Sequence, residues 1–342
     1  MFEPRQEISF SEALLAPDSL DAFIAWREEI WDLHPVVVWD RSFLLPTPVI
    51  TESGKLVSSD VYNKRTGTGF VSPPRMGKTS CLLSMVESIR EAFPATAVLF
   101  MEAYLSSNPT ENAFYADMLK GAKFPLRHGR TGAERREQAK DLYLALGKDG
   151  DNRRVVLFVD EAQNWGECEW TWLKAVQTHL WRNGIALVVI SFGQPQLIER
   201  RNSLIQTGRR DLTDRFLRRL RAFRAIRTLS DAEAIFKLFD ETRFPESTGV
   251  SYSEFFFPQA FRAGWRFKHE SKLALQAFIG NGPKEKINIG MEWMALAIKH
   301  FLTEFTDCDS AGWKGTVEQW QEAVASSDWF DNDDIDDEKD LL

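Results

Sequence analysis

Three continuous apolar runs constrain the fold most strongly. They are AVLFM at residues 97–101, VVLFV at 155–159 and IALVVIS at 185–191, and segments with helical spacing separate them. Strands that are apolar on both faces are typical of a parallel sheet that helices cover on both sides. GTGFV at 67–71 and FRAIRTL at 223–229 predict two further strands. We therefore expect an α/β core in which helices flank a parallel sheet.

The segments on either side of this core have other patterns. Residues 230–305 are mostly helical in pattern, and SDAE at 230–233 has the form of a capping box, which predicts a C-terminal helical lid. Before the core, Ser19 is a suitable N-cap for a helix that stops before Pro35, and an extended segment is predicted to follow it. The expected divisions are an N-terminal extension (1–60), the α/β core (61–229), the helical lid (230–305) and a C-terminal segment with an acidic tail (306–342).

The charge is distributed unevenly along the chain. The net charge is −8, but residues 328–342 carry eight acids and one lysine, which leaves −1 for residues 1–327. Residues 200–227 contain ten arginines and two aspartates. An acidic end of this kind is typically solvated and disordered. The alternative is an interaction tail, or one that competes with nucleic acid for the basic surface.

Composition argues against several classes of protein. No run approaches the roughly 18 apolar residues that a membrane span requires, and the N-terminus lacks the apolar region of a secretory signal. The three cysteines are far apart and odd in number, which indicates reduced thiols, and the five histidines have no metal-ligand spacing. We expect a cytoplasmic protein that does not contact a membrane.

The stretch SPPRMGKT, between the first predicted strand and a helical segment, nearly matches a phosphate-binding loop. In such a loop, backbone N–H groups and the helix N-terminus surround phosphates, the lysine (Lys78) contacts the β- and γ-phosphates, and the hydroxyl of Thr79 is a ligand of Mg²⁺. The pattern has glycine where this chain has Ser72, a small residue that we expect to be tolerated. The predicted ATP contacts are Ser72, Pro73, Pro74, Arg75, Met76, Gly77, Lys78, Thr79 and Ser80.

Two acids follow the strand at 155–159. We expect Asp160 to orient Mg²⁺, with Thr79, and Glu161 to act as the general base that activates water. Negative charge at a helix N-terminus would also explain an isolated Asp-Glu pair. A phosphate-binding loop upstream in an α/β pattern favours the catalytic interpretation.

The strand at 185–191 ends in Ser191, and Gln194 lies just beyond it. A polar group at this edge would sense the γ-phosphate from the neighbouring strand. For Ser191 alone, a small polar residue that merely closes a strand is an equally good interpretation. Together, the three motifs predict an ATP-binding domain with a complete hydrolytic pair.

The order of these motifs, followed by an arginine-bearing helix and a helical lid, resembles the AAA+ ATPases over about residues 60–305. DEAQ, then GQPQL at 193–197, then DRF at 214–216 resemble the TnsC/TniB-type transposition regulators and the related ExeA-type ATPases. The compact size and the absence of a transmembrane helix favour the transposition branch.

The resemblance implies further site residues. Arg215 would be an arginine finger that contacts the ATP bound by a neighbouring subunit, and Arg209 and Arg210 are the alternatives. An arginine supplied in trans stabilises the charge that develops during phosphoryl transfer. Several of these arginines also fit a solvated helix face. Arg266 would be the sensor-2 arginine, although Trp265 stands where the family commonly has a small residue.

The resemblance also implies a function. Such regulators assemble on double-stranded DNA as ATP-dependent homo-oligomeric rings or helical filaments, bridge a target-selection protein to a transposase, and disassemble on ATP hydrolysis. The alternatives are a signalling or defence NTPase, or an ExeA-like NTPase, that switches protein–protein interactions without DNA. A small-molecule kinase fits less well, because such kinases rarely have a DE pair placed to activate water.

A basic cluster between residues 120 and 136 is the predicted DNA contact. Its members lie on or beside a Gly/Pro-containing loop and would follow phosphates without reading sequence. A solvated surface loop is the alternative interpretation. The predicted DNA-binding residues are Lys120, Lys123, Arg127, Arg130, Arg135 and Arg136.

Overall fold

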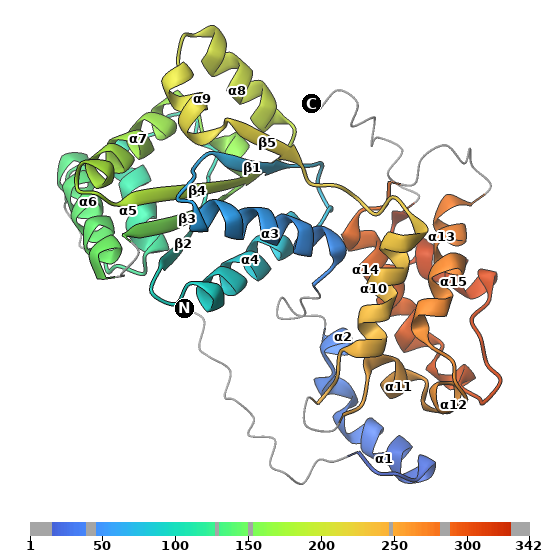
Figure 1. Cartoon of the computed structure of the whole chain (residues 1–342). Coiled ribbons are helices and arrows are strands. Elements are labelled where there is room, and N and C mark those ends of the chain that lie inside the picture. Colours follow the sequence, from blue (N-terminus) through green and yellow to red (C-terminus); the bar gives the residue numbers. More distant parts are fainter. Residues whose placement is uncertain are drawn as a thin grey trace. The chain divides into compact units, whose positions relative to one another are not determined.

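The computed structural model describes residues 16–38, 46–126, 130–149, 153–245, 249–280 and 288–329. The chain divides into two compact units. We call the described residues between Val49 and Ala225 the α/β unit. The helical unit consists of the described residues up to Pro48 and from Ile226 onward. Figure 1 shows the sheet in the first and the helices of the second.

The α/β unit contains a parallel five-stranded sheet. Its strands lie in the order β2-β3-β4-β1-β5, and every neighbouring pair is parallel. The prediction of a parallel sheet flanked by helices is therefore confirmed. The strands are β1 (Thr68–Val71), β2 (Ala97–Glu102), β3 (Arg154–Asp160), β4 (Ala186–Gly193) and β5 (Arg219–Ala222).

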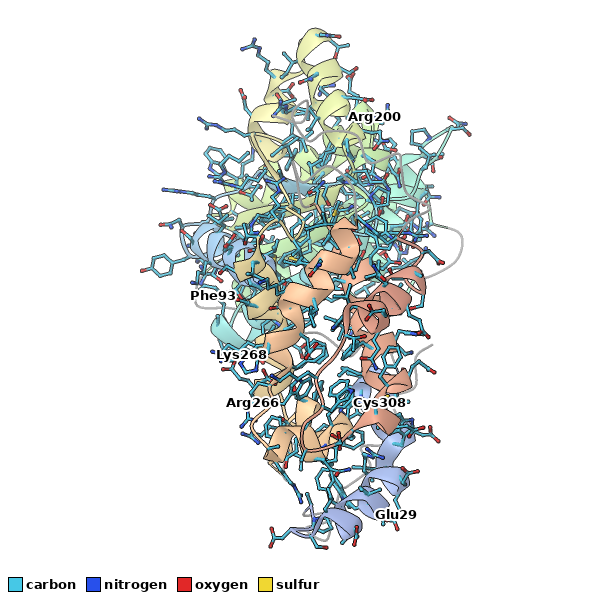
Figure 2. All side chains as sticks on the ribbon, turned by 90° about the vertical axis from the view of Figure 1, so that its right-hand side faces the viewer. Glu29, Phe93, Arg200, Arg266, Lys268 and Cys308 are labelled. Atoms are coloured by element: carbon cyan, nitrogen blue, oxygen red, sulfur yellow. The ribbon has the colours of Figure 1, made fainter. Side chains whose placement is uncertain are left out.

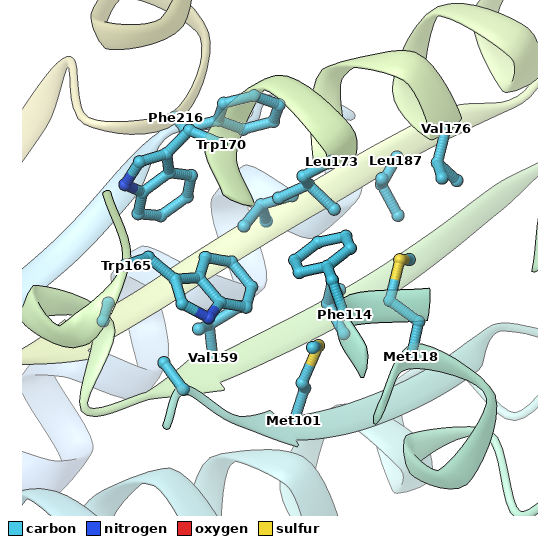
Figure 3. Close-up of a cluster of buried hydrophobic side chains, with 14 of the residues drawn as sticks. Met101, Phe114, Met118, Val159, Trp165, Trp170, Leu173, Val176, Leu187 and Phe216 are labelled. Carbon is cyan, nitrogen blue, oxygen red and sulfur yellow. The ribbon is translucent and has the colours of Figure 1, made fainter. Parts of the chain in front are cut away.

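Helices pack on both faces of this sheet, and the alternation of β3 shows why its sequence is apolar throughout. Val155, Leu157 and Val159 belong to one buried cluster, part of which Figure 3 shows, whereas Val156 and Phe158 belong to another. Successive side chains of a strand point to opposite faces. The first cluster includes residues of α5 (Glu111–Gly121), α6 (Gly132–Asp149), α7 (Glu167–Arg182), α8 (Gln196–Gln206) and α9 (Arg210–Phe216); the second includes residues of α3 (Pro48–Tyr62) and α4 (Lys78–Ala92).

The last strand lies earlier than predicted. The sequence predicts it at 223–229, but β5 is Arg219–Ala222, in which only Leu220 is buried. A strand at the end of the sheet does not need apolar side chains on both faces, so it has no continuous apolar run. Phe223 and Ala225 are buried beyond the end of β5, which explains why this stretch has an apolar pattern.

The prediction of an extended segment before the core is also wrong, because much of this segment is helical. Residues 35–38 form the short helix α2, and Pro48–Tyr62 form α3. Helix α3 buries Ile50, Val57 and Val61 along one face, but serines and one glycine between them conceal the helical period in the sequence. The described part of the predicted extension is divided between the two units, since α3 from Val49 onward lies in the α/β unit and α2 lies in the helical unit.

The helical unit combines N-terminal and C-terminal segments. Its elements are α1 (Leu20–Ile30), η1 (Trp31–Leu33), α2 (Pro35–Val38), α10 (Leu229–Glu241), α11 (Tyr252–Phe256), α12 (Pro258–Arg262), η4 (Phe267–Glu270), α13 (Ser271–Ile279), α14 (Met291–Glu304), η5 (Thr306–Cys308) and α15 (Val317–Ala325). Ser19 occupies the N-cap position of α1, although its side chain makes no capping bond. The predicted capping box at 230–233 is displaced: Thr228 caps α10, and Asp231 is its partner.

A buried histidine joins α2 to α11 in this unit. His34 is fully buried, and its ring stacks on Phe255 with the ring centroids 4.4 Å apart. Phe244, Tyr252 and Phe256 meet the ring edge-on. Nδ1 of His34 accepts a hydrogen bond from the backbone N–H of Val36. Burial lowers the pKa of His34 to about 3, so the imidazole is neutral in the folded chain.

A buried carboxylate lies in the aromatic core of the same unit. Glu270 accepts hydrogen bonds from Nε1 of Trp265 at 2.8 Å, Nε1 of Trp320 at 3.2 Å and the backbone N–H of Gly315 at 3.2 Å. These donors satisfy a charge that would otherwise be costly to bury. No helix within the described ranges is both long and apolar enough to cross a membrane.

Candidate nucleotide-binding site

The predicted phosphate-binding loop joins β1 to α4. Gly77 is the N-cap residue of α4 and has φ 86° and ψ 21°, in the left-handed region that favours glycine. The next residue, Lys78, begins the helix, so the unpaired N–H groups of the first turn of α4 lie at the end of the loop. Free N–H groups and the helix dipole make such a terminus suited to an anion.

The lysine of the loop is buried, and its hydrogen-bond partners within the described ranges are all oxygen atoms. The exposed fraction of Lys78 is 7%, and Nζ donates to the carbonyls of Ser72 at 2.8 Å and Pro73 at 2.6 Å, and to Oγ of Ser72 at 3.4 Å. Burial lowers the pKa of Lys78, and the charges of Glu161 and Asp160 act in the opposite direction. A desolvated cation in this position gains most from a bound anion, so Lys78 fits a phosphate group.

Ser72 stands where the loop pattern has glycine, and the structure accommodates it. Its exposed fraction is 1%, and its backbone N–H donates to the carbonyl of Gly193 at the end of β4, at 3.2 Å. The loop is thus attached to the neighbouring strand by a backbone bond that does not require glycine.

The carboxylate at the end of β3 faces the helix that follows the loop. Oγ1 of Thr79 donates to Oδ2 of Asp160 at 3.2 Å, and the backbone N–H of Glu161 donates to Oδ1 at 3.0 Å. Burial raises the pKa of Asp160, which these two bonds and Lys78 oppose. The described residues contain no group of three or more histidine, cysteine, aspartate or glutamate side chains that could hold a metal ion by themselves. Mg²⁺ needs few protein ligands when phosphates supply the rest, so Thr79 and Asp160 fit this ion.

The second carboxylate is held by two amides. Nε2 of Gln194 donates to Oε2 of Glu161 at 3.2 Å, and Nε2 of Gln163 donates to the same oxygen. Glu161 has φ 51° and ψ 35°, a left-handed conformation that is unusual for a residue with a side chain. Gln163 was not among the predicted site residues; the DEAQ motif contained it, but nothing in the spacing indicated its partner.

The two residues predicted to sense phosphate lie in different surroundings. Gln194 is beside Glu161, in the turn between β4 and α8. Ser191 lies within β4, level with Gly69 of β1, and is fully buried. Its Oγ has no hydrogen-bond partner among the described residues. The sensing role of either residue stays a prediction.

The three arginines considered for the finger differ in their surroundings. Arg209 is bonded to Glu167, to Oγ1 of Thr171 at 3.0 Å and to Asp211 at 3.2 Å. Arg210 and Arg215 are exposed on α9, and Nη1 of Arg215 donates to Oε1 of Gln177 at 3.1 Å. Arg209 is therefore held by the fold, whereas the side chain of Arg215 is exposed and has one hydrogen-bond partner among the described residues.

Arg266 belongs to the helical unit, where Figure 2 labels it. Its Nη1 donates to the carbonyls of Phe261 at 2.9 Å and Trp265 at 2.6 Å, and its guanidinium lies 3.8 Å from the ring centroid of Phe261. These bonds account for its position within the helical unit, and the sensor-2 role stays a prediction.

Several residues of the predicted DNA-binding cluster have acidic or carbonyl partners. Lys120 pairs with Asp117 at 2.8 Å, and Arg136 pairs with Glu111 at 3.0 Å and with Glu137 at 3.2 Å. Nη1 of Arg135 donates to the carbonyl of Asn112. Arg130 is half-buried, Lys123 is exposed, and Arg127 lies outside the described residues.

Comparison with known proteins supports the assignment of an α/β nucleotide-binding fold. Residues 67–200 match the family model described as an AAA domain. None of the curated proteins with which the chain was compared matches it. The Aeropyrum pernix ORC2 protein is similar in two solved structures, its ADPNP-ADP complexes and its ADP form. Sequence identity is 12% in both; the TM-scores are 0.59 and 0.58, and the matches cover 86% and 84% of this chain and 71% of that protein's chain. This chain therefore has an AAA+ P-loop fold.

Proposed function

We propose that the chain binds ATP with Mg²⁺ and hydrolyses it. One observation carries this proposal: Oγ1 of Thr79 lies 3.2 Å from Oδ2 of Asp160, with Glu161 next in the chain. Hydroxyl, metal-orienting carboxylate and base thus lie together at the end of the loop. Lys78 would offset phosphate charge, Thr79 and Asp160 would hold Mg²⁺, and Glu161 would take a proton from the attacking water. The bound metal would neutralise charge on the phosphates.

The variant Glu161→Gln tests the hydrolytic role. The amide keeps the shape of the side chain but cannot take a proton, so we expect ATP binding to persist while turnover falls by about 100-fold or more. Binding is measured with a fluorescent ATP analogue and turnover by phosphate release. Normal turnover by this variant would show that Glu161 is not the base.

We further propose that ATP controls assembly of the chain on double-stranded DNA, and that the assembly regulates transposition by bridging a target-selection protein to a transposase. The support is the resemblance in DEAQ, GQPQL and DRF, together with the exposed Arg215 on α9. In a ring or filament of identical subunits, Arg215 would complete the neighbour's site. Hydrolysis would then depend on assembly.

The alternative is an NTPase that switches protein–protein interactions without DNA. The ion pairs of Lys120 and Arg136 favour it, since a paired cation gains less from a phosphate than a free one. ATPase rates with and without duplex DNA separate the two functions. DNA stimulation and DNA-dependent oligomers support transposition regulation, whereas ATP-dependent oligomers that ignore DNA support the alternative.

A further inference from the structure

Both polar atoms of the Gln163 side chain form hydrogen bonds. Nε2 donates to Oε2 of Glu161, and Oε1 accepts the backbone N–H of Gln194 at 3.0 Å. The side chain is buried, with an exposed fraction of 8%. It therefore joins the end of β3 to the turn that follows β4.

These two bonds fix which way the amide faces. A reversed amide would place its oxygen against the carboxylate of Glu161 and its NH₂ group against the N–H of Gln194. Glutamate would also place an oxygen against the carboxylate, while methionine would supply neither donor nor acceptor. Only an amide of this length satisfies both partners at once.

The bonds also select one oxygen of the base. Gln163 and Gln194 both donate to Oε2 of Glu161, and Oε1 accepts no hydrogen bond from the described residues. Two donors on one oxygen restrict rotation of the carboxylate about its last torsion. The other oxygen is left to accept a proton from water.

The backbone around Gln163 leaves little room for it to move. A Cβ atom on Gly193 would lie 2.8 Å from Oε1 of Gln163, so the chain passes close to the amide at this glycine. On the other side, Nε of Arg200 on α8 donates to the backbone carbonyl of Gln163 at 3.2 Å. Gln163 is thus held by α8 as well as by the turn.

We propose that Gln163 is a positioning residue for hydrolysis, which orients Glu161 so that Oε1 faces the water and which ties that orientation to the β4–α8 turn. This inference rests on the proposed ATPase function and adds a residue to its site. Gln163 acts through Glu161, so it affects turnover rather than ATP affinity.

Two substitutions and a control test this role. Gln163→Met removes the donor and the acceptor, whereas Gln163→Glu keeps the acceptor for Gln194 and replaces the donor with a repelling carboxylate. Loss of a hydrogen bond to a charged group predicts that kcat falls roughly tenfold or more in both variants, with the Kd for ATP unchanged. Asn164→Ala is the matched control, because Asn164 lies in the same turn and donates to the carbonyl of Ala103 rather than to Glu161. We expect it to keep the wild-type kcat.

A double variant shows whether the effect passes through Glu161. In a Glu161→Gln background, Gln163→Met should not lower the residual ATPase rate further, because Gln163 affects turnover only through the carboxylate of Glu161, which this background already lacks. Wild-type kcat in Gln163→Glu, or an additive loss in the double variant, would overturn the inference. If the wild-type chain itself has no ATPase activity, the proposed function fails instead, so the two failures are distinguishable.

Discussion

Arg154 at the start of β3 donates a 2.7 Å hydrogen bond to the carbonyl of Val61 in the last turn of α3. Its Nε donates to Oγ1 of Thr96 at 3.1 Å, and its guanidinium lies 4.6 Å from the ring centroid of Phe93. A buried cation therefore satisfies the carbonyl end of a helix that the sequence does not predict. Burial lowers the pKa of Arg154, in keeping with partners that are carbonyl, hydroxyl and ring.

We expect Arg154→Met to lower the free energy of unfolding by about 1–3 kcal/mol, because methionine fills part of the space but donates no hydrogen bond to the carbonyl of Val61 or to Oγ1 of Thr96. Urea denaturation measures the change. Arg153→Met is the control: Arg153 is exposed, so its substitution should stay within about 0.5 kcal/mol of wild type. Equal losses in both variants would contradict the role of Arg154.

The buried imidazole of His34 predicts a pH dependence of stability. The pKa of His34 is about 3 in the folded chain, compared with 6.5 for an ordinary histidine. Below pH 6.5, His34 therefore binds a proton in the unfolded chain but stays neutral in the folded chain. His34 thus contributes stability above pH 6.5, and this contribution falls as the pH drops from 6.5 towards 3.

His34→Phe removes this titration while keeping an aromatic ring among its neighbours. Unfolding midpoints of both proteins between pH 4 and 8 provide the test. The variant should lose stability less steeply than wild type below pH 6.5, whatever its stability at neutral pH. Parallel curves for the two proteins would show that His34 does not remain neutral.

Three N–H groups donate to the two carboxylate oxygens of Glu270, so we expect Glu270→Gln to be less stable than the wild type. Glutamine supplies one acceptor oxygen, and its NH₂ group would meet an indole or backbone N–H in place of the second. We expect the free energy of unfolding to fall by about 2 kcal/mol. Tryptophan fluorescence during denaturation reports it, because Trp265 and Trp320 bond to this carboxylate. Glu304→Gln, at an exposed position of α14, should leave stability unchanged.

A mixing experiment tests whether Arg215 acts in trans. Arg215→Ala should abolish most ATPase activity, and so should Glu161→Gln. A mixture of the two should regain activity, because a Glu161→Gln subunit can donate its arginine to the intact site of an Arg215→Ala neighbour. Arg210→Ala, another exposed arginine of α9, is the control and should be active alone. A mixture that stays inactive would place the finger in cis or elsewhere.

The sequence predicts the parts of this fold that a continuous pattern specifies. The strands β2, β3 and β4 are apolar because both faces are buried, and the loop and the DE pair have fixed spacing, so their places in the fold could be expected. Helix α3 could not be predicted from the sequence, because its stability comes partly from Arg154, which is far away in the sequence. Tertiary contacts of this kind override local propensity.

The candidate site shows the same division. The sequence places Lys78 and Thr79 at the end of the loop after β1, and Asp160 and Glu161 at the end of β3. The bond from Gln163 to Glu161 depends instead on a tight turn with left-handed φ at Glu161. A glutamine two positions beyond the base has no periodic signal. The pairing of Lys120 with Asp117 was likewise visible only in the structure.

The short last strand, β5, has a consequence for solubility. Its sequence RLRA places arginines on either side of the one buried leucine, in a strand of four residues at the end of the sheet order. Short, charged strands are poor templates for the addition of a foreign strand. The sheet should therefore resist edge-to-edge aggregation on this side, and replacing Arg219 and Arg221 with threonine should make the chain precipitate at lower concentration.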